Sequence, residues 1–575
     1  MRWWDACSRA GGDVIRAAAG IRPGHVAVSL CLAASLLAGY GAAGRPVPVP
    51  EDLRGGRTFH VSPQGDDHAD GRTPETPWRT LRRADAERLQ PGDRLLLEGG
   101  ARFPGSLSIG RGEGGSAGRP VVLDSYGGGR AVIMSAGSRG IEVHNTSGVV
   151  IRNLIVTGDA ASYGSNDGIA FVSDLPGDRK LPHLRVTGVD VSGFRNGIRL
   201  HGGAGASGFR DVVIHDCAVH DNRDAGLVTD GPAFDADAPA YAHEQVTVSR
   251  VVAFANRGDP RAHHRNTGNG IVLGSVRDGV VEESVAHDNG RSSSAIADEG
   301  PVGIWTYDST RMVIQRNVAH GNRTGSWVDG GGFGLDNNVS YSLVQYNLSY
   351  GNDGPGFQMY SAAPNTAHTD NAIRYNISRD DCRKLQDYGG IVVFGSHVGN
   401  VALYQNTVLV TANGAVRAPA LRLRPSLGAV SVRNNVFATD GAPVVVAQKA
   451  FETAEVLMQG NDYHSPRGWT LWWGERGYAD LAAWRAGTGQ ETQGPRATGT
   501  DADPCLVDAA LPADRPGLRT DGPEGGALVS RCAHALTAAA VDLRAVGIDP
   551  GPVDYFGTPL TGSPGVGAAQ AGPEA

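Results

Sequence analysis

Short alternations of apolar and polar residues recur along most of the chain, roughly thirty residues apart. GIRL at Gly197, GIVL at Gly270, GIWT at Gly303 and GFGL at Gly332 each follow a turn-forming stretch. Alternation with a period of two is typical of a strand that turns one side to a core. No helical period fits between these segments, so each repeat is predicted to hold at least two short strands joined by tight turns.

A second pattern runs in phase with the first: an apolar residue, two mostly polar residues and then asparagine. The asparagines are Asn317, Asn347, Asn376, Asn406 and Asn435. Strand-only repeats of this length predict a solenoid whose coils stack about 4.8 Å apart, so that equivalent residues form columns. A buried Asn amide at a coil turn can bond both the next Asn and the turn backbone, which explains this column as structure.

The predicted fold class is therefore all-β, a solenoid of parallel strands over residues 57–455, including its N-terminal cap. Thr76 and Pro77 can start a short cap helix that runs to Leu89. Residues 456–575 lack the repeat and are predicted to form a loop-rich C-terminal cap. Within it, YADLAAWRAGTGQE is expected to be a short helix, and the tail is expected to fray.

Residues 1–44 are predicted to direct export. Four arginines precede the apolar run VAVSLCLAASLLAG, and the small residues of GYGAAG follow it as a cleavage zone. The run is short for a membrane span, so a signal peptide is favoured and an uncleaved anchor is the alternative. In both cases the remainder of the chain is expected to be extracellular or at the cell surface.

Composition and charge exclude some partners. The chain has 575 residues, a formal net charge of −8 and no basic stripe, so nucleic acid is not an expected partner. No protein partner is indicated, and a monomer is expected. Of the cysteines beyond residue 44, Cys505 and Cys532 share the C-terminal region and can pair, whereas Cys217 and Cys382 are expected to be buried thiols.

Several stretches resemble one known group. Six segments are similar to segments of secreted bacterial right-handed parallel β-helix proteins of the pectate-lyase-like superfamily. They are FHVSPQGDDHADGRTPETPWRTL, GPVGIWTYDS, DGGGFGLD, VQYNLSYGNDGPGF, IRYNISRDD and DYFGTPL. The resemblance covers about residues 57–570, and it implies a single-stranded right-handed parallel β-helix, in agreement with the chirality of parallel crossovers. It does not identify a reaction, because the superfamily includes lyases, glycoside hydrolases, epimerases and binding proteins. The subgroup's core motif usually reads DGGGFDLD, so Gly334 removes one carboxylate of the pattern.

Strand alternation assigns faces to the predicted coils. Phe333, Leu335 and Met359 are expected to point inward, and their neighbours outward. One outward column is predicted to contain Arg199, Val228, Val272, Trp305, Gly334, Gln358 and Val393. The next is predicted to contain His201, Asp230, Gly274, Tyr307, Asp336, Tyr360 and Gly395.

These columns are the candidate site. Aromatic residues beside a carboxylate suit sugar stacking and acid–base chemistry, so Asp336 is the candidate acid, base or nucleophile. Gly334 is expected to leave open space beside it. The expected substrate-binding residues are Trp305, Tyr307, Gln358, Tyr360, His201 and Asp230.

A third column holds Asp329, Asp353 and Asp387, each three residues before a strand glycine. Carboxylates on adjacent coils lie about 5 Å apart, where they raise each other's pKa or bind a cation. Asp329 and Asp353 are thus candidate catalytic partners of Asp336, and all three are candidate calcium ligands. The alternative is that Asp before Gly only turns the chain.

The candidate bases for an elimination reaction are Arg383 and Lys384, in the loop SRDDCRKLQD. The alternative is that this is simply a solvated charged loop. Insertions between Gly231 and Gly270 and before Gly303 are expected to wall the binding face, with His263, His264, Asp298 and Glu299 as further candidates.

We therefore expect a secreted polysaccharide-active β-helix protein, either a lyase or a glycoside hydrolase, that needs no cofactor or only calcium. The alternative is a non-catalytic carbohydrate-binding or cell-surface β-helix protein, and Gly334 favours it.

Overall fold

The structure is a computed structural model, and the residues that it describes are 55–159, 166–203, 205–362, 367–509, 527–532, 536–560 and 565–569. The chain divides into two compact units, Pro46–Asp542 with Gly551–Ala575, and Met1–Arg45 with Leu543–Pro550. The described part of the second unit contains the 3-10 helix η1 (Arg544–Val546). The expected export segment 1–44 lies outside the described residues and stays a prediction. No described helix is long and apolar enough to cross a membrane.

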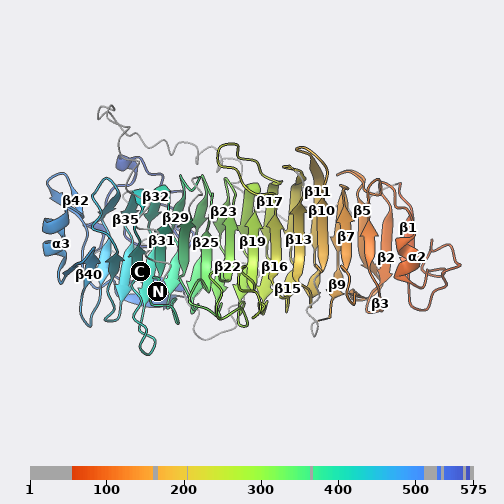
Figure 1. The fold of residues 1–575 in the computed structure, drawn as a ribbon, viewed down its shortest axis with the longest axis horizontal. Helices are drawn as coiled ribbons and strands as arrows, with labels where there is room; N and C mark the ends of the chain where they lie inside the picture. The colour runs from red at the N-terminus through yellow and green to blue at the C-terminus, as the bar shows by residue number, and fades with distance from the viewer. Residues whose placement is uncertain are drawn as a thin grey trace. The chain divides into compact units, whose positions relative to one another are not determined.

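Three stacks of strands build the larger unit, as Figure 1 shows. We number them sheets 1, 2 and 3 by their first strands β1, β3 and β4; they have 14, 13 and 14 strands. Apart from the end pairs β1–β2 and β40–β41, neighbouring strands within each sheet are three strands apart in the chain, so each coil contributes one strand to every sheet. The all-β solenoid is confirmed, with a third short strand in each coil beyond the two that the alternation predicted.

The strand bounds follow by sheet. Sheet 1 contains β1 (Thr58–Val61), β2 (Arg94–Glu98), β5 (Val121–Tyr126), β8 (Val149–Arg152), β11 (Lys180–Thr187), β14 (Gly208–His215), β17 (His243–Ser249), β20 (Val276–Glu282), β23 (Val313–Gln315), β26 (Leu343–Gln345), β29 (Ala372–Arg374), β32 (Val398–Tyr404), β35 (Leu427–Arg433) and β38 (Val456–Gln459). Sheet 2 contains β3 (Arg102–Pro104), β6 (Ala131–Met134), β9 (Leu154–Thr157), β12 (Asp190–Ser192), β15 (Ala218–His220), β18 (Val252–Phe254), β21 (Val285–His287), β24 (Val318–His320), β27 (Leu348–Tyr350), β30 (Ile377–Arg379), β33 (Thr407–Val410), β36 (Val436–Thr439) and β39 (Asp462–His464). Sheet 3 contains β4 (Leu107–Ile109), β7 (Ile141–His144), β10 (Ile169–Ser173), β13 (Asn196–Gly202), β16 (Ala225–Asp230), β19 (Asn269–Gly274), β22 (Val302–Tyr307), β25 (Gly331–Leu335), β28 (Phe357–Ser361), β31 (Ile391–Gly395), β34 (Leu421–Leu423), β37 (Val445–Ala447), β40 (Leu471–Trp473) and β41 (Arg476–Tyr478), which pairs antiparallel with β40.

The core lies inside the coils, where equivalent side chains stack. Phe333 and Phe357 are buried and stack with their ring centroids 5.1 Å apart. Leu335 and Met359 are fully buried beside them. The inward face predicted for these strands is confirmed.

The asparagine column is a hydrogen-bonded ladder. From Asn317 to Asn435 each side-chain Nδ2 donates to Oδ1 of the next asparagine at 2.9 to 3.1 Å. The ladder continues to Asn461, which donates to the buried Glu491 carboxylate at 2.8 Å. A second ladder, which the sequence analysis missed, runs through Asn222, Asn256, Asn289, Asn322 and Asn352 to Asp381. Both ladders satisfy turn backbone that would otherwise be buried without partners.

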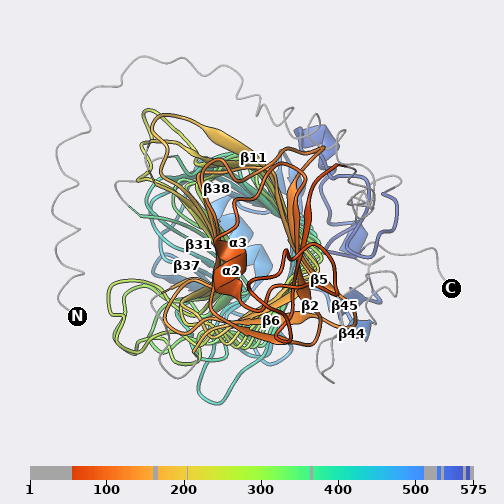
Figure 2. The same cartoon turned by 90° about the vertical axis from the view of Figure 1, so that its right-hand side faces the viewer.

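Helices close the two ends of the coil stack, and Figure 2 shows α2 at the near end and α3 in blue at the far end. Helix α2 (Leu81–Asp85) is shorter than the predicted 76–89, because Trp78 hydrogen-bonds with His60 and Ser62 and continues the sheet edge. Helix α3 (Leu481–Thr488) confirms the predicted C-terminal helix and ends at Gly489, whose φ is 70°. Parallel strands continue through β40, past the expected boundary at residue 455.

The C-terminal region also contains two antiparallel strand pairs, β42 (Thr492–Gln493) with β43 (Arg496–Ala497), and β44 (Leu506–Ala509) with β45 (Ala527–Ser530). Cys505 and Cys532 form a disulfide, while Cys217 and Cys382 are buried free thiols, as predicted.

The register of sheet 3 agrees with the predicted columns up to β28 and differs at the next coil. Gln358 pairs with Val392 and Tyr360 with Phe394, whereas Val393 and Gly395 were expected. A one-residue shift in register moves a side chain to the opposite face. The outward column therefore gains an aromatic ring, and Tyr360 and Phe394 lie with their centroids 4.6 Å apart.

Candidate active site

A cavity of about 740 Å³ lies on the outer face of sheet 3. Its floor comes from β13, β16, β19, β22, β28 and β31, and its walls come from loops that flank the strands of sheet 3. Of the residues expected to bind substrate or do chemistry, Asp230, Trp305, Tyr307, Asp329, Asp336 and Tyr360 line this cavity. The predicted outward columns therefore do meet in one hollow.

Trp305 and Tyr307 form part of the floor. Trp305 is only 7% exposed, and its Nε1 donates to Asn269 Oδ1 at 2.9 Å. It is consequently fixed within the floor, with little of its ring open to a substrate. Tyr307 lies across Gly274, where an added Cβ would come within 2.2 Å of the tyrosine ring, so glycine is required at this position.

Gly334 does not leave an opening beside Asp336. A Cβ at this position would lie 3.3 Å from both Gln358 Cγ and Trp305 Cβ, closer than most side chains pack. The expectation of open space was wrong, because the two flanking side chains have already filled it. A side chain at Gly334 would require one of them to shift by a few tenths of an ångström.

Asp336 follows β25 directly and is partly buried at the cavity wall. Its Oδ1 accepts a hydrogen bond from the Asn337 N–H at 2.6 Å. Burial raises the pKa of Asp336 to about 8, and the nearby carboxyls of Asp329 and Glu299 act in the same direction. The group can therefore hold a proton at neutral pH.

Asp329 lies in the turn before β25, with a left-handed φ of 54°. Its carboxylate accepts hydrogen bonds from the Gly300 N–H at 2.8 Å and from Gln358 Nε2 at 3.4 Å. Burial raises the pKa of Asp329 to about 6, against the effect of these two donors. Asp329 thus makes the turn and also presents a carboxyl to the cavity, so turn formation does not exclude its candidate catalytic role.

The other members of the predicted aspartate column lie elsewhere. The Asp353 carboxylate is paired with Arg323 at 3.0 Å, and Asp387 is exposed. Neither lines the cavity, and the three aspartates do not form a shared calcium site. In the described part of the chain, no group of three or more His, Cys, Asp or Glu side chains is arranged to hold a metal ion.

Arg383 and Lys384, the bases expected for elimination, also lie outside the cavity lining. Arg383 Nη2 donates to the Thr411 carbonyl at 2.6 Å, and Lys384 Nζ donates to the Thr324 carbonyl at 2.6 Å. Both side chains are thus engaged in holding loops together.

Three more predicted binding residues have defined positions. His201 pairs with the Asp230 carboxylate, whose pKa falls to about 2 because hydrogen bonds from His201 and Arg199 outweigh its burial. Gln358 is buried behind the floor and bonds Asp329. Gln358 thus orients a candidate catalytic group and does not face the cavity itself.

The insertions wall the cavity, as predicted, but mainly with other residues. Asp298 and Glu299 line it, whereas the exposed His263 and His264 do not. Eight lining residues were not predicted from the sequence: Arg195, Asp224, Arg265, Asn266, Trp327, Tyr388, Phe394 and Arg424. Two features of the sequence could have indicated them: the charged residues of the insertion and the turn aspartate before Gly226.

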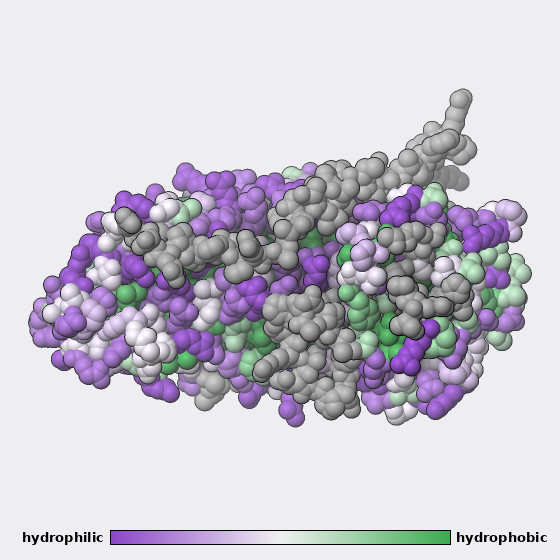
Figure 3. Space-filling model, turned by 180° about the vertical axis from the view of Figure 1, so that it is seen from behind, coloured by the Kyte–Doolittle hydropathy of each residue, from purple (hydrophilic) through white to green (hydrophobic). Residues whose placement is uncertain are grey.

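Trp327 stands at the rim of the cavity and is 65% exposed. Large exposed hydrophobic side chains are few among the described residues: Ile296, Trp327, Tyr341 and Trp472. The face seen in Figure 3 is mostly hydrophilic with small separate hydrophobic areas. Because few large hydrophobic side chains are exposed among the described residues, Trp327 at the mouth of the cavity is distinctive, and it suits stacking on a sugar ring.

Comparisons with known proteins bear on the fold. The model of the right-handed β-helix region matches residues 262–478. A lacto-N-biosidase of Bifidobacterium longum subsp. longum is 24% identical over 505 residues, an alignment that covers 71% of this chain and 30% of that protein. The chain thus spans less than a third of that relative's length.

Solved structures include similar molecules. A GH136 lacto-N-biosidase from Eubacterium ramulus is 16% identical, with 69% of this chain and 66% of that chain covered and a TM-score of 0.48. The complex of XylC with xylose is 11% identical, with 89% and 98% covered and a TM-score of 0.46. The parallel strand stacks show that the larger unit is a parallel β-helix, and the family match identifies residues 262–478 as a right-handed β-helix region.

Proposed function

We propose that this protein is a glycoside hydrolase that cleaves an oligosaccharide or polysaccharide in the cavity on sheet 3. The observation that carries the proposal is the carboxyl pair Asp329 and Asp336, which share one cavity and both have a raised pKa. Glycoside hydrolysis commonly needs two carboxyls, one protonated and one ionised. The relative in B. longum is named as a lacto-N-biosidase, which supports the same class of reaction.

Asp336 is the proposed acid. Of the two groups it holds its proton to the higher pH, so near neutrality Asp336 is protonated and Asp329 is ionised. Asp336 donates its proton to the glycosidic oxygen as the bond from that oxygen to the anomeric carbon breaks. The Asp329 carboxylate either attacks the anomeric carbon or takes a proton from the attacking water. Water supplies the OH of the new reducing end, and the pair returns to one proton.

Hydrolysis is favoured over elimination by the positions of the bases. Elimination from a uronate needs a base beside the abstracted proton and positive charge beside the sugar carboxylate. Arg383 and Lys384 donate to loop carbonyls outside the cavity lining. A lyase reaction would depend on other residues.

The proposal is tested with Asp336→Asn and Asp329→Asn on a panel of neutral and uronate-containing glycans. Each change is expected to lower kcat/KM by about a thousandfold or more in a reducing-end assay, because each removes a group that exchanges or neutralises charge in the transition state. Asp387→Asn, which alters an exposed aspartate outside the cavity, is the matched control and is expected to keep full activity.

Two further measurements separate the roles. An aryl glycoside with a good leaving group should restore cleavage in the variant that lacks the acid, and azide should rescue the variant that lacks a nucleophile. Rescue of Asp329→Asn by the good leaving group would reverse the assigned roles. Ultraviolet absorbance of an unsaturated product would identify a lyase, and binding of glycans without any turnover would identify a binding protein.

A further inference from the structure

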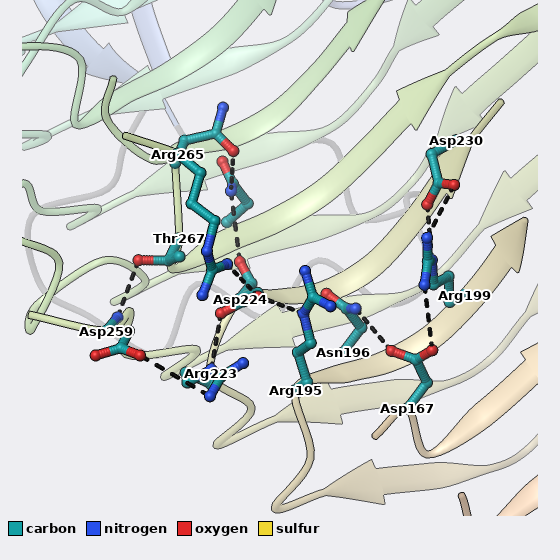
Figure 4. Close-up of polar contacts among 12 residues, drawn as sticks. Asp167, Arg195, Asn196, Arg199, Arg223, Asp224, Asp230, Asp259, Arg265 and Thr267 are labelled. Atoms are coloured by element: carbon teal, nitrogen blue, oxygen red, sulfur yellow. Dashed lines mark hydrogen bonds and ion pairs between the residues drawn. The ribbon is translucent and has the colours of Figure 1, made fainter. Parts of the chain in front are cut away.

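An arginine–aspartate network lines the half of the cavity that lies toward the N-terminus, and Figure 4 shows it. Asp224 is its centre, with a side chain that is 8% exposed. Its carboxylate accepts from Arg195 Nε at 2.7 Å and Arg223 Nε at 2.9 Å, and also from Arg265 Nη1. Arg265 comes from the insertion before β19, so this loop completes the network.

A second part of the network is built on Arg199. Its Nε and Nη2 donate to the two Asp230 oxygens at 2.7 and 3.0 Å, a bidentate pair. Asp167 lies 3.6 Å from Arg199 Nη1 and accepts from Asn196 Nδ2 at 2.7 Å. Fixed guanidinium and carboxylate groups of this kind offer donors and acceptors in set directions, which is what recognition of adjacent hydroxyls requires.

The network is too far from the carboxyl pair to serve the same sugar ring. Asp230 and Asp336 belong to one outward column and are separated by three coil steps, from β16 to β25. At about 4.8 Å for each step the distance is about 14 Å. The two halves are nevertheless connected, because the Asn266 N–H donates to Glu299 Oε2 at 3.2 Å.

The charge of the cavity limits what it can accept. Among the described lining residues are four arginines, Arg195, Arg199, Arg265 and Arg424, and six carboxyl groups, Asp224, Asp230, Asp298, Glu299, Asp329 and Asp336. Three of these arginines, Arg195, Arg199 and Arg265, belong to the network, and each is paired with an aspartate. A uronate would place a negative charge in a cavity that has no excess of positive charge, which is unfavourable. An uncharged sugar avoids this cost.

We infer that the arginine–aspartate network is a distal sugar subsite that binds an uncharged sugar ring of the substrate, with Arg265 as a specificity-determining residue. The inference rests on the proposed function, since it places the scissile bond at Asp329 and Asp336. The substrate class that follows is a neutral glycan at least long enough to span both halves of the cavity.

The first test compares Arg265→Ala and Arg265→Lys with Arg277→Ala. Arg277 is the matched control, because its side chain is 42% exposed, against 41% for Arg265, and it also pairs with one carboxylate, Glu244. Arg265→Ala should raise KM for a neutral glycan about tenfold with kcat changed less than about twofold, the loss of a charge-assisted contact. Arg265→Lys should recover only part of this, because lysine lacks the planar fork. Arg277→Ala should leave both constants unchanged.

A purely structural role for Arg265 would instead lower the melting temperature and leave KM unchanged, which would overturn the inference. The same result follows if Arg265→Ala lowers kcat and leaves KM as it is. Each of these outcomes would leave the hydrolase proposal intact, because the reaction itself would still depend on Asp336.

The second test uses the Asp336→Asn variant, whose binding is measured without turnover, on an array of neutral, sulfated and uronate glycans. We expect the Asp336→Asn variant to retain neutral glycans. The double variant that also carries Arg265→Ala should lose them. Retention of uronate or sulfated glycans alone would overturn the inference. If no glycan is retained, both the subsite and the proposed function fail.

Discussion

At the scale of single residues, the chemistry of the site depends on where two carboxyl groups are buried. Asp329 and Asp336 differ from the many other aspartates of this chain because both face one cavity and both have a raised pKa. Asp353, on the next coil, is paired with Arg323. Aspartates that look alike in the sequence therefore separate into an ion pair, an exposed turn and a candidate catalytic pair.

The pH dependence of activity should be bell-shaped. The reaction needs one proton shared by the pair, and the pKa values of about 6 for Asp329 and about 8 for Asp336 bound that range. Below it both groups are protonated and the carboxylate is lost; above it both are ionised and the acid is lost. Measuring kcat/KM from pH 4 to 10 checks this. A profile without the alkaline decline would contradict the role of Asp336.

The same burial predicts that Asp336→Asn stabilises the protein. Because the pKa of Asp336 is raised to about 8 from an ordinary 3.8, the folded state holds a proton that the unfolded state has lost. The wild type therefore loses stability as pH rises from about 4 to about 8. Asparagine cannot ionise, so the variant should be more stable by at least about 1 kcal/mol at pH 8.

At pH 4 the difference between the two proteins should vanish, since both states of the wild type are then largely protonated. Thermal unfolding at the two pH values gives the comparison, with Asp387→Asn expected to follow the wild type throughout. A variant that is less stable than the wild type at pH 8 would mean that Asp336 is ionised and held by favourable contacts.

At the scale of elements, columns across coils hold the solenoid together. Stacked aromatic rings and leucines fill the interior, while two asparagine ladders satisfy the turn backbone. The first ladder was predictable because its asparagines recur in a recognisable local pattern. The second also has a local pattern, because each of its asparagines follows a histidine or aromatic ring by two residues, as in His220–Asn222 and Tyr350–Asn352, but the prediction did not use it.

Asn347→Ala should destabilise the fold strongly. The change removes the partner of the Asn317 N–H, which donates to Asn347 Oδ1 at 2.9 Å, and the donor to the Ile314 carbonyl at 2.8 Å. Two buried backbone groups are left unpaired, at a cost of about 3 kcal/mol. Urea unfolding measures this, and Asn413→Ala in an exposed loop is the control. Equal midpoints for the two variants would show that the ladder contributes little.

At the scale of the whole molecule, coil stacking decides which distant segments meet. The insertion that carries Arg265 and the loop that carries Glu299 wall the same cavity, with Asn266 and Glu299 hydrogen-bonded. The protein has a net charge of −8, and the cavity has no excess of positive charge. Long-range electrostatic attraction of a glycan therefore contributes little to binding.

Glycan cleavage should accordingly be nearly insensitive to salt. Between 0.05 and 0.5 M sodium chloride we expect kcat/KM for a neutral glycan to change by less than about twofold, since screening acts only on charged partners. A steep decline with salt would indicate an anionic substrate. A sulfated or uronate glycan, measured in parallel, shows what such a decline looks like.

Much of the fold was accessible from the sequence, and less of the site. The columns Trp305–Gly334–Gln358 and Tyr307–Asp336–Tyr360 follow from strand alternation alone, and the structure has them in the predicted register. At β31 the prediction was offset by one residue from the strand glycine Gly390, and it therefore placed Val393 and Gly395 on the outward face that Val392 and Phe394 occupy. Arg383 and Lys384 were misplaced because loop side chains have no periodicity that fixes their direction.

By itself the sequence determined the repeat, the parallel solenoid, the first asparagine ladder and the face on which Asp336 lies, because each depends on periodic local patterns. Only the tertiary structure decided that Asp329 joins Asp336 while Asp353 does not, and that Gly334 is closed by Trp305 and Gln358. It also decided that Arg265 completes a network around Asp224. These features depend on burial and on contacts between segments far apart in the chain, which no local pattern encodes.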